Sequence, residues 1–207
     1  MCFLNTKFRV YYTPSILINV RRQILSIFLS ERAKSIKPSA TLAVSAHAAQ
    51  LRAQGKDIIS LSAGEPDFDT PAHIKSAAIK AINEGQTKYT AVDGTLELKQ
   101  AVINKFRREN DLAYENNQIL VSCGAKHSLY NIFQATLNPD DEIIIPAPYW
   151  ASYPDMAKLS GAAPVIIETS IDNNFKIDAS VLEKAISEKT RMFLLNSPSN
   201  PSGSNYT

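Results

Sequence analysis

The sequence predicts an α/β fold in which a mostly parallel sheet carries helices on both faces. From residue 51 onward, short apolar runs alternate with stretches whose apolar residues recur at helical spacing. The run Ile143–Ile145 shows no polar alternation, as in a strand that is buried on both faces. Glycine, proline and asparagine mark the turns between these segments. An alternation of this kind is typical of βαβ units, and therefore of a parallel sheet.

The first predicted elements lie before residue 110. Asp57–Ser62 is a short apolar run that we expect to form a strand or an extended arm. Thr70 and Pro71 favour a helix start with Thr70 as the N-cap, and Gly85 favours the end of that helix. A second helix is predicted from about Thr95 to Glu109, because its apolar residues fall on one stripe.

Four strands are predicted in the second half of the chain. They are, in order, Ile119–Val121, Glu142–Pro146, Pro164–Glu168 and Met192–Leu195. We expect helices after Gly124, at Tyr153–Ser160, and after a capping box formed by Ser180 and Glu183. Asn138–Asp141 is predicted as a turn. Ligands of such sheets bind beyond the carboxyl ends of the strands, so the residues that follow each strand are the candidates for a site.

The composition is that of an ordinary globular chain. Of its 207 residues, 44% are hydrophobic and 20% are charged. A net charge of +2 is too small to indicate a nucleic-acid partner, and the apolar runs are too short to span a membrane. Cys2 and Cys123 form neither a disulfide framework nor a zinc pattern. We therefore predict no metal, no nucleic acid and no membrane.

The first 30 residues differ from the rest of the chain. They contain four basic residues and no acidic one, whereas the remainder has a small excess of acidic residues. This segment is either an organelle-targeting peptide, which is typically basic and poor in acidic residues, or an extension without a role. The predicted location is the cytoplasm, with organelle targeting left open.

Several residues that follow the predicted strands have side chains or backbones suited to a ligand. Gly124, Ala125 and Lys126 open a helix, where free N–H groups favour a phosphate, although many α/β turns contain glycine without a ligand. Trp150 follows the second strand of this series and either stacks on a planar ring or packs in the core. Asn200 offers an amide from a proline-rich loop, or serves the turn alone.

Taken together, these residues resemble a known family. Its motifs occur in order as Ala63–Phe68 (AGEPDF), Lys88–Tyr89, Gly124–Lys126, Pro148–Trp150 and Asn196–Gly203 (NSPSNPSG). They resemble the class I/II aminotransferases, pyridoxal-phosphate enzymes of fold type I, from about Leu29 to Thr207. Ser35–Val44 (SIKPSATLAV) is similar to the N-terminal arm of the bacterial aspartate or aspartate/prephenate aminotransferases.

The resemblance implies three regions. Residues 1–28 form a basic extension outside it, 29–69 an arm and part of the small domain, and 70–207 a partial large domain that binds pyridoxal phosphate. It also implies a homodimer, with an amino acid and a 2-oxo acid as substrates. As an alternative to aspartate, the complete enzyme would prefer prephenate or aromatic amino acids.

The resemblance assigns a role to each candidate residue. Those expected to bind the cofactor are Gly124, Ala125, Lys126, Trp150, Asn200 and, across the dimer, Tyr89. Those expected to border the substrate are Gly64, Lys37, Trp150 and Asn200.

No catalytic residue is assigned within these 207 residues. In this family the Schiff-base lysine, the acidic partner of the pyridine nitrogen and the arginine that binds the α-carboxylate all follow the Asn-Pro loop. The expectation is therefore an N-terminal fragment that is inactive alone. Two alternatives remain open: a non-catalytic fragment that binds the cofactor or dimerises, and a remnant that folds poorly.

Overall fold

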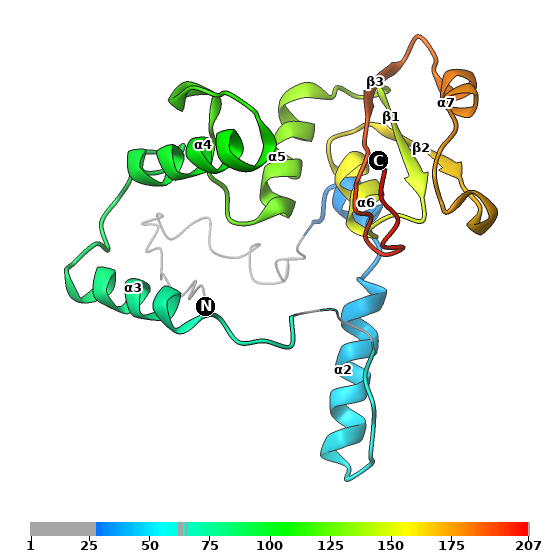
Figure 1. Cartoon of the computed structure of the whole chain (residues 1–207). Coiled ribbons are helices and arrows are strands. Elements are labelled where there is room, and N and C mark those ends of the chain that lie inside the picture. The colour runs from blue at the N-terminus through cyan, green and yellow to red at the C-terminus, as the bar shows by residue number, and fades with distance from the viewer. Residues whose placement is uncertain (1–27, 62–63, 65, 207) are drawn as a thin grey trace, which may run out of the picture.

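The computed structural model describes residues 28–61, 64 and 66–206, and Figure 1 shows their arrangement. The basic segment 1–27, together with residues 62, 63, 65 and 207, lies outside the described residues. The helices are α1 (Glu31–Lys34), α2 (Ala40–Ala53), α3 (Ala72–Asn83), α4 (Leu96–Asn110), α5 (Ala125–Thr136), α6 (Ser152–Leu159) and α7 (Ala179–Ala185). The strands are β1 (Glu142–Ala147), β2 (Ala163–Glu168) and β3 (Thr190–Phe193), and the 3-10 turns are η1 (Asn116–Gln118) and η2 (Ile171–Asn173).

The three strands form a parallel sheet in the order β2-β1-β3. Helix α6 joins β1 to β2, and α7 joins β2 to β3. Because these two connections cross the sheet in opposite directions, right-handed crossovers place α6 and α7 on opposite faces. The predicted α/β class is confirmed.

The core lies around the central strand β1. Ile143, Ile144 and Ile145 are fully buried, and so is Phe133 of α5. Full burial of one such side chain contributes about 1.5–3 kcal/mol, so this run anchors the sheet. Helix α6 adds Tyr153 and other apolar residues to the same cluster. The continuous apolar run was thus the strongest strand signal in the sequence, and it forms the most buried strand among the described residues.

The helices before residue 110 form largely as predicted. The Thr95 side chain accepts the Leu98 amide at 3.3 Å and caps α4. Helix α3 ends at Asn83, and Gly85, which follows the C-cap residue Glu84, has φ +78°; the Gln86 amide donates back to the Ala81 carbonyl at 2.9 Å. The predicted N-cap of α3 is wrong, because the helix begins one residue later, with Pro71 as a cap that offers no side-chain hydrogen bond.

The predicted strand Ile119–Val121 is also wrong. Ile119 is extended, with φ −112° and ψ 128°, but no strand among the described residues lies beside it. The Val121 amide donates to the Asp93 carbonyl at 3.0 Å, and the Ile119 amide donates to the Asn116 carbonyl of the preceding turn at 3.4 Å. An extended segment counts as a strand only when a neighbour pairs with it, so three strands form where four were expected. The described part of Asp57–Ser62, residues 57–61, likewise forms no strand, leaving the extended arm.

The capping box predicted at Ser180 and Glu183 is absent. Helix α7 begins earlier, with Asp178 at the N-cap position and no side-chain cap, so Ser180 lies inside the helix. The Ser180–Glu183 pattern is present in the sequence, but the N-cap position lies two residues before Ser180. The other predicted turns and helices after residue 124 are confirmed within a residue or two.

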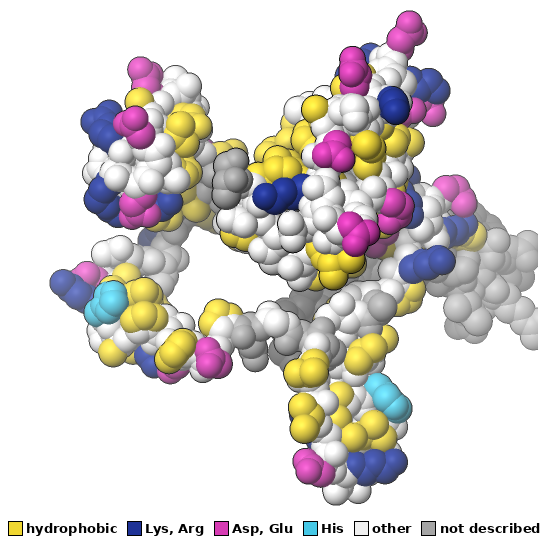
Figure 2. Space-filling view, turned by 45° about the vertical axis from the view of Figure 1, so that its right-hand side comes forward, with side chains coloured by type: hydrophobic (Ala, Val, Ile, Leu, Met, Phe, Trp, Pro, Cys, Tyr) yellow, Lys and Arg dark blue, Asp and Glu magenta, His cyan; other side chains and the backbone are white. Residues whose placement is uncertain are grey.

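Large apolar side chains remain exposed on several elements of the described structure. Ile74, Ile79 and Ile82 of α3 are 50–63% exposed, and Figure 2 shows apolar side chains spread over the separate limbs of the molecule. At the sheet, Phe193 of β3 and Leu195 just beyond it are also exposed. The outer edge of β3 thus has no strand beside it among the described residues. None of the described helices combines the length and the apolar character needed to cross a bilayer.

Candidate functional site

The carboxyl ends of β1 and β3 lie next to each other, because the strands are parallel neighbours. The segment Pro148–Trp150 leaves the end of β1, and the loop from Asn196 leaves the end of β3. The Thr169 hydroxyl, just beyond β2, donates to the Ala147 carbonyl and fixes the end of β1. This edge of the sheet is where the topology of an α/β fold favours a ligand.

A hollow of about 590 Å³ opens beside these loops. Three of the predicted site residues line it: Gly64, Trp150 and Asn200. They come from the arm, from the segment after β1 and from the loop after β3. Its other lining residues are Thr41, Tyr149, Ala151 and Pro201. The fold thus brings residues 136 positions apart in sequence to one surface depression.

The loop that presents Asn200 is held by its own hydrogen bonds. The Asn196 Oδ1 accepts the Asn200 amide at 2.8 Å. The Ser199 amide donates to the Ser204 carbonyl, and the Gly203 amide returns to the Ser199 carbonyl, each at 2.8 Å. These bonds fix the backbone of the loop at Asn200. Asn200 itself is exposed and lines the hollow.

The start of α5 presents free backbone donors. Gly124 is the N-cap of this helix, with φ +88° and no other atom within 4 Å of where a Cβ would stand. The amides of Ala125 and Lys126 donate to no other described residue. These are the unsatisfied donors of a helix N-terminus, and the positive end of the helix dipole adds to them. Together they suit an anion.

Lys126 connects this helix start to the hollow. Its Nζ lies 4.8 Å from the centroid of the Trp150 ring, a cation–π contact. The indole is half-buried and meets the Tyr153 ring edge-on, with centroids 5.4 Å apart. Burial raises the pKa of the Tyr153 phenol, which keeps this supporting ring neutral. Trp150 is therefore braced on one side by the core and touched by an ammonium group.

Two predicted site residues lie elsewhere. Tyr89 is fully exposed in the loop between α3 and α4, and Lys37 is exposed between α1 and α2; neither lines the hollow. Sequence reasoning missed Asn196, which holds the loop, and Thr41 and Tyr149, which line the hollow. Asn196 opens the NSPSNPSG motif, so the motif contained that signal, whereas Thr41 is brought in by the fold alone.

The acidic groups with perturbed pKa values lie outside this hollow. Lys99 donates to Asp93 at 2.5 Å and lowers the pKa of that carboxyl, and Lys75 does the same to Asp69 at 2.6 Å. Among residues 28–61, 64 and 66–206, no three His, Cys, Asp or Glu side chains gather as metal ligands. The polar and aromatic groups at the hollow are the Thr41 hydroxyl, the Tyr149 phenol, the Trp150 indole and the Asn200 amide, with the Lys126 ammonium against the indole. This donor set fits a flat ring that carries a phosphate ester.

Comparisons with known proteins agree with this chemistry. Residues 56–207 match the family model described as aminotransferase class I and II. The aspartate/prephenate aminotransferase of Nitrosomonas europaea is 61% identical over 179 residues, which are 86% of this chain and 45% of that protein. The aspartate aminotransferase of Bacillus sp. strain YM-2 is 52% identical over 86% of this chain and 46% of its own length.

Solved structures show the same relationship. The aspartate aminotransferase of Rhizobium meliloti is 51% identical, with a TM-score of 0.83 over 87% of this chain and 45% of that one. The Thermus thermophilus aspartate aminotransferase with maleate is 46% identical, with a TM-score of 0.84 over 87% of this chain and 47% of that one. The chain thus spans about half the length of the relatives that it matches. It has the fold of the pyridoxal-phosphate enzymes of fold type I and belongs to the class I and II aminotransferases.

Proposed function

We propose that this chain supplies the cofactor-binding half of an aminotransferase that exchanges an amino group between aspartate and a 2-oxo acid by means of pyridoxal phosphate. The observation that carries the proposal is the hollow that unites Gly64, Trp150 and Asn200, with Lys126 against the indole. When bound, pyridoxal phosphate supplies an electrophilic aldehyde and an electron-accepting ring. The residues of this chain bind and orient it.

The start of α5 would hold the phosphate. The amides of Ala125 and Lys126 point to no other described acceptor, and Gly124 leaves room for close approach. The Lys126 ammonium adds a charge-assisted contact. Anion binding at a helix N-terminus needs no further protein charge, so this end of the site can form from α5 alone.

The loops beyond β1 and β3 would hold the ring. The Trp150 indole offers a flat apolar face, and the Asn200 amide offers a hydrogen bond to a ring substituent. A backbone group at Gly64 would meet the substrate carboxylate. Lys37 would approach the distal carboxylate of a dicarboxylic substrate, and Tyr89 would contact the cofactor phosphate of a second subunit. The exposure of both side chains leaves them available for those roles.

Aspartate is the favoured amino acid. The relatives from Nitrosomonas europaea and Bacillus sp., matched over about 45% of their length, are named aspartate/prephenate and aspartate aminotransferases, and the Thermus structure was solved with maleate, a dicarboxylate. Prephenate or an aromatic substrate is the alternative. None of the residues placed around the hollow takes the role of the Schiff-base lysine, so we propose that the 207 residues bind the cofactor without turnover.

Binding is measured through Trp150, the only tryptophan in the chain. Titration with pyridoxal phosphate should quench its fluorescence saturably, because the ring stacks on the indole. Asn200→Ala should weaken binding about tenfold, the size of one hydrogen bond to a polarised group. Asn117→Ala, exposed in η1 and outside the hollow, is the matched control.

Two outcomes would contradict the proposal. Quenching that never saturates would show that pyridoxal phosphate has no specific site beside Trp150. A cofactor that stays attached to one lysine after borohydride reduction and dialysis would show that these residues include a Schiff-base lysine.

A further inference from the structure

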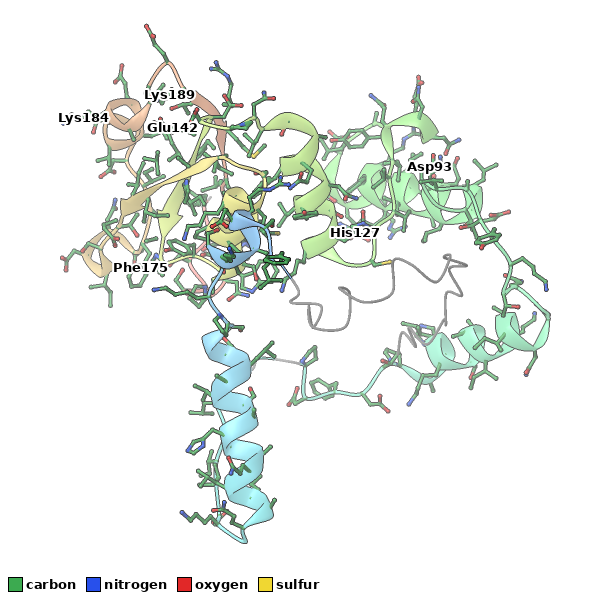
Figure 3. All side chains as sticks on the ribbon, turned by 180° about the vertical axis from the view of Figure 1, so that it is seen from behind. Asp93, His127, Glu142, Phe175, Lys184 and Lys189 are labelled. Atoms are coloured by element: carbon green, nitrogen blue, oxygen red, sulfur yellow. The ribbon has the colours of Figure 1, made fainter. Side chains whose placement is uncertain are left out.

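The proposed function leaves the His127 side chain, at the start of α5, without a role. It lies in the first turn of the helix, where Figure 3 labels it. Its Nδ1 accepts the backbone amide of Cys123 at 3.1 Å. An imidazole nitrogen that accepts a hydrogen bond carries no proton, so this contact requires an unprotonated Nδ1.

The position of His127 resembles half of a capping box. In that motif the third helical residue reaches back to the amide of the N-cap residue. Here the N-cap is Gly124, which has no side chain, and the third residue, His127, reaches one position further, to Cys123. The glycine leaves the helix without a side-chain cap, and the histidine supplies the only side-chain hydrogen bond to this turn among the described residues.

The hydrogen bonds of the turn divide its amides into two groups. The Cys123 amide is taken by His127, and the Gly124 amide by the Ser122 carbonyl at 2.8 Å. The next two amides, of Ala125 and Lys126, have no described acceptor. The amides on the N-terminal side of the turn are therefore bonded within the protein, whereas the two amides after Gly124 are available to a phosphate.

We propose that His127 is a positioning residue that holds the turn 122–124 in the conformation that presents the two free amides to the phosphate. The proposal rests on the proposed function for the identity of the ligand, but the hydrogen bond itself does not depend on it. A preformed turn avoids the conformational cost of ordering these residues on binding. The effect on affinity should be the size of one exposed hydrogen bond, about three- to tenfold.

The wild-type chain tests the hydrogen bond without any cofactor. We expect the ¹⁵N signals of His127 at neutral pH to show an unprotonated Nδ1 and a protonated Nε2. We also expect the Cys123 amide to exchange with solvent more slowly than in His127→Ala. A ring protonated on Nδ1, or a Cys123 amide that exchanges equally fast in both proteins, would overturn the proposal.

The dissociation constant of pyridoxal phosphate, read from Trp150 fluorescence, tests the consequence. His127→Ala should raise it about three- to tenfold, and His127→Gln, whose Oε1 can accept the same amide, should restore it. His73→Ala on exposed α3 is the control and should leave it unchanged. Equal loss in His127→Ala and His127→Gln would overturn the positioning role. If wild type binds no pyridoxal phosphate while the ¹⁵N and exchange results hold, the proposed function fails and the hydrogen bond stands.

Discussion

Gly94 makes the closest backbone approach among the described glycines, and its replacement tests how the turn at α5 is supported. A Cβ built on Gly94 would lie 2.7 Å from Val121 Cγ2 and 2.9 Å from Val121 Cβ. The backbone there has φ +108°, and the neighbouring Asp93 carbonyl accepts the Val121 amide. Val121 cannot rotate away easily, because a β-branched side chain is stiff at χ1. Gly94→Ala must therefore move the backbone of one of the two segments.

Two costs add in Gly94→Ala. A side chain at positive φ costs roughly 1–2 kcal/mol, and overpacking a close contact costs roughly 1–3 kcal/mol. Loss of the freedom of glycine in the unfolded chain returns about 0.4–1 kcal/mol. The net loss of unfolding free energy should be about 1–5 kcal/mol. Urea unfolding followed by Trp150 fluorescence measures it as a lower midpoint at constant slope.

Gly85→Ala separates the two costs. Gly85 has φ +78° and nothing within 4 Å of the added Cβ, so this variant should lose only the backbone part less the same unfolded-state gain, roughly 0–1.6 kcal/mol. Adding Val121→Ala to Gly94→Ala should recover part of the overpacking loss, because the two changes share one contact. If Gly94→Ala costs no more than Gly85→Ala, the close contact with Val121 does not support the turn.

Three further predictions concern the core, the ion pair of α4 and the helix start. Ile144→Ala should lower the unfolding free energy by about 2–5 kcal/mol, because the residue is fully buried, and an exposed Ile79→Ala should change it little. Lys99 lowers the pKa of Asp93, so the ion pair stabilises the fold above the unfolded-state pKa of about 3.9, and this stabilisation is lost as pH falls through the lower folded-state pKa. In Asp93→Asn the midpoint of urea unfolding should therefore depend less on pH in that acidic range. Lys126→Met should weaken pyridoxal phosphate binding, read by absorbance after dialysis, about tenfold, whereas Lys158→Met, on α6 outside the hollow, should bind like wild type.

The sequence signals succeeded where structure is set locally and failed where it depends on a neighbour. The isoleucine run predicted β1 because burial on both faces is written into the composition of the strand. Ile119–Val121 has the same apolar character but no adjacent strand among the described residues, and no local pattern reports that. Thr70 is a good cap by type, yet the helix starts at Ala72 with Pro71 as the N-cap, a one-residue difference that residue type alone does not determine.

The candidate site shows the same division. Each of Gly64, Lys126, Trp150 and Asn200 was identified from its position after a strand or within a motif. Their assembly was not, since three of them line one hollow and the fourth joins it through a ring contact. The Lys126–Trp150 contact links the proposed phosphate end of the site, at α5, to its proposed ring end, beyond β1.

Through that contact, binding at the phosphate end of the proposed site should affect the ring end, because one side chain serves both. An ammonium that lies on an indole is worth about 0.5–2 kcal/mol, and the same ammonium is proposed to meet the phosphate. Binding a phosphate without a ring should therefore draw Lys126 away from Trp150 and change the indole fluorescence, although no ring stacks there. Inorganic phosphate should produce this change in wild type and not in Lys126→Met, since the variant has no charge to move. An equal response of both proteins would show that the two ends of the site act independently.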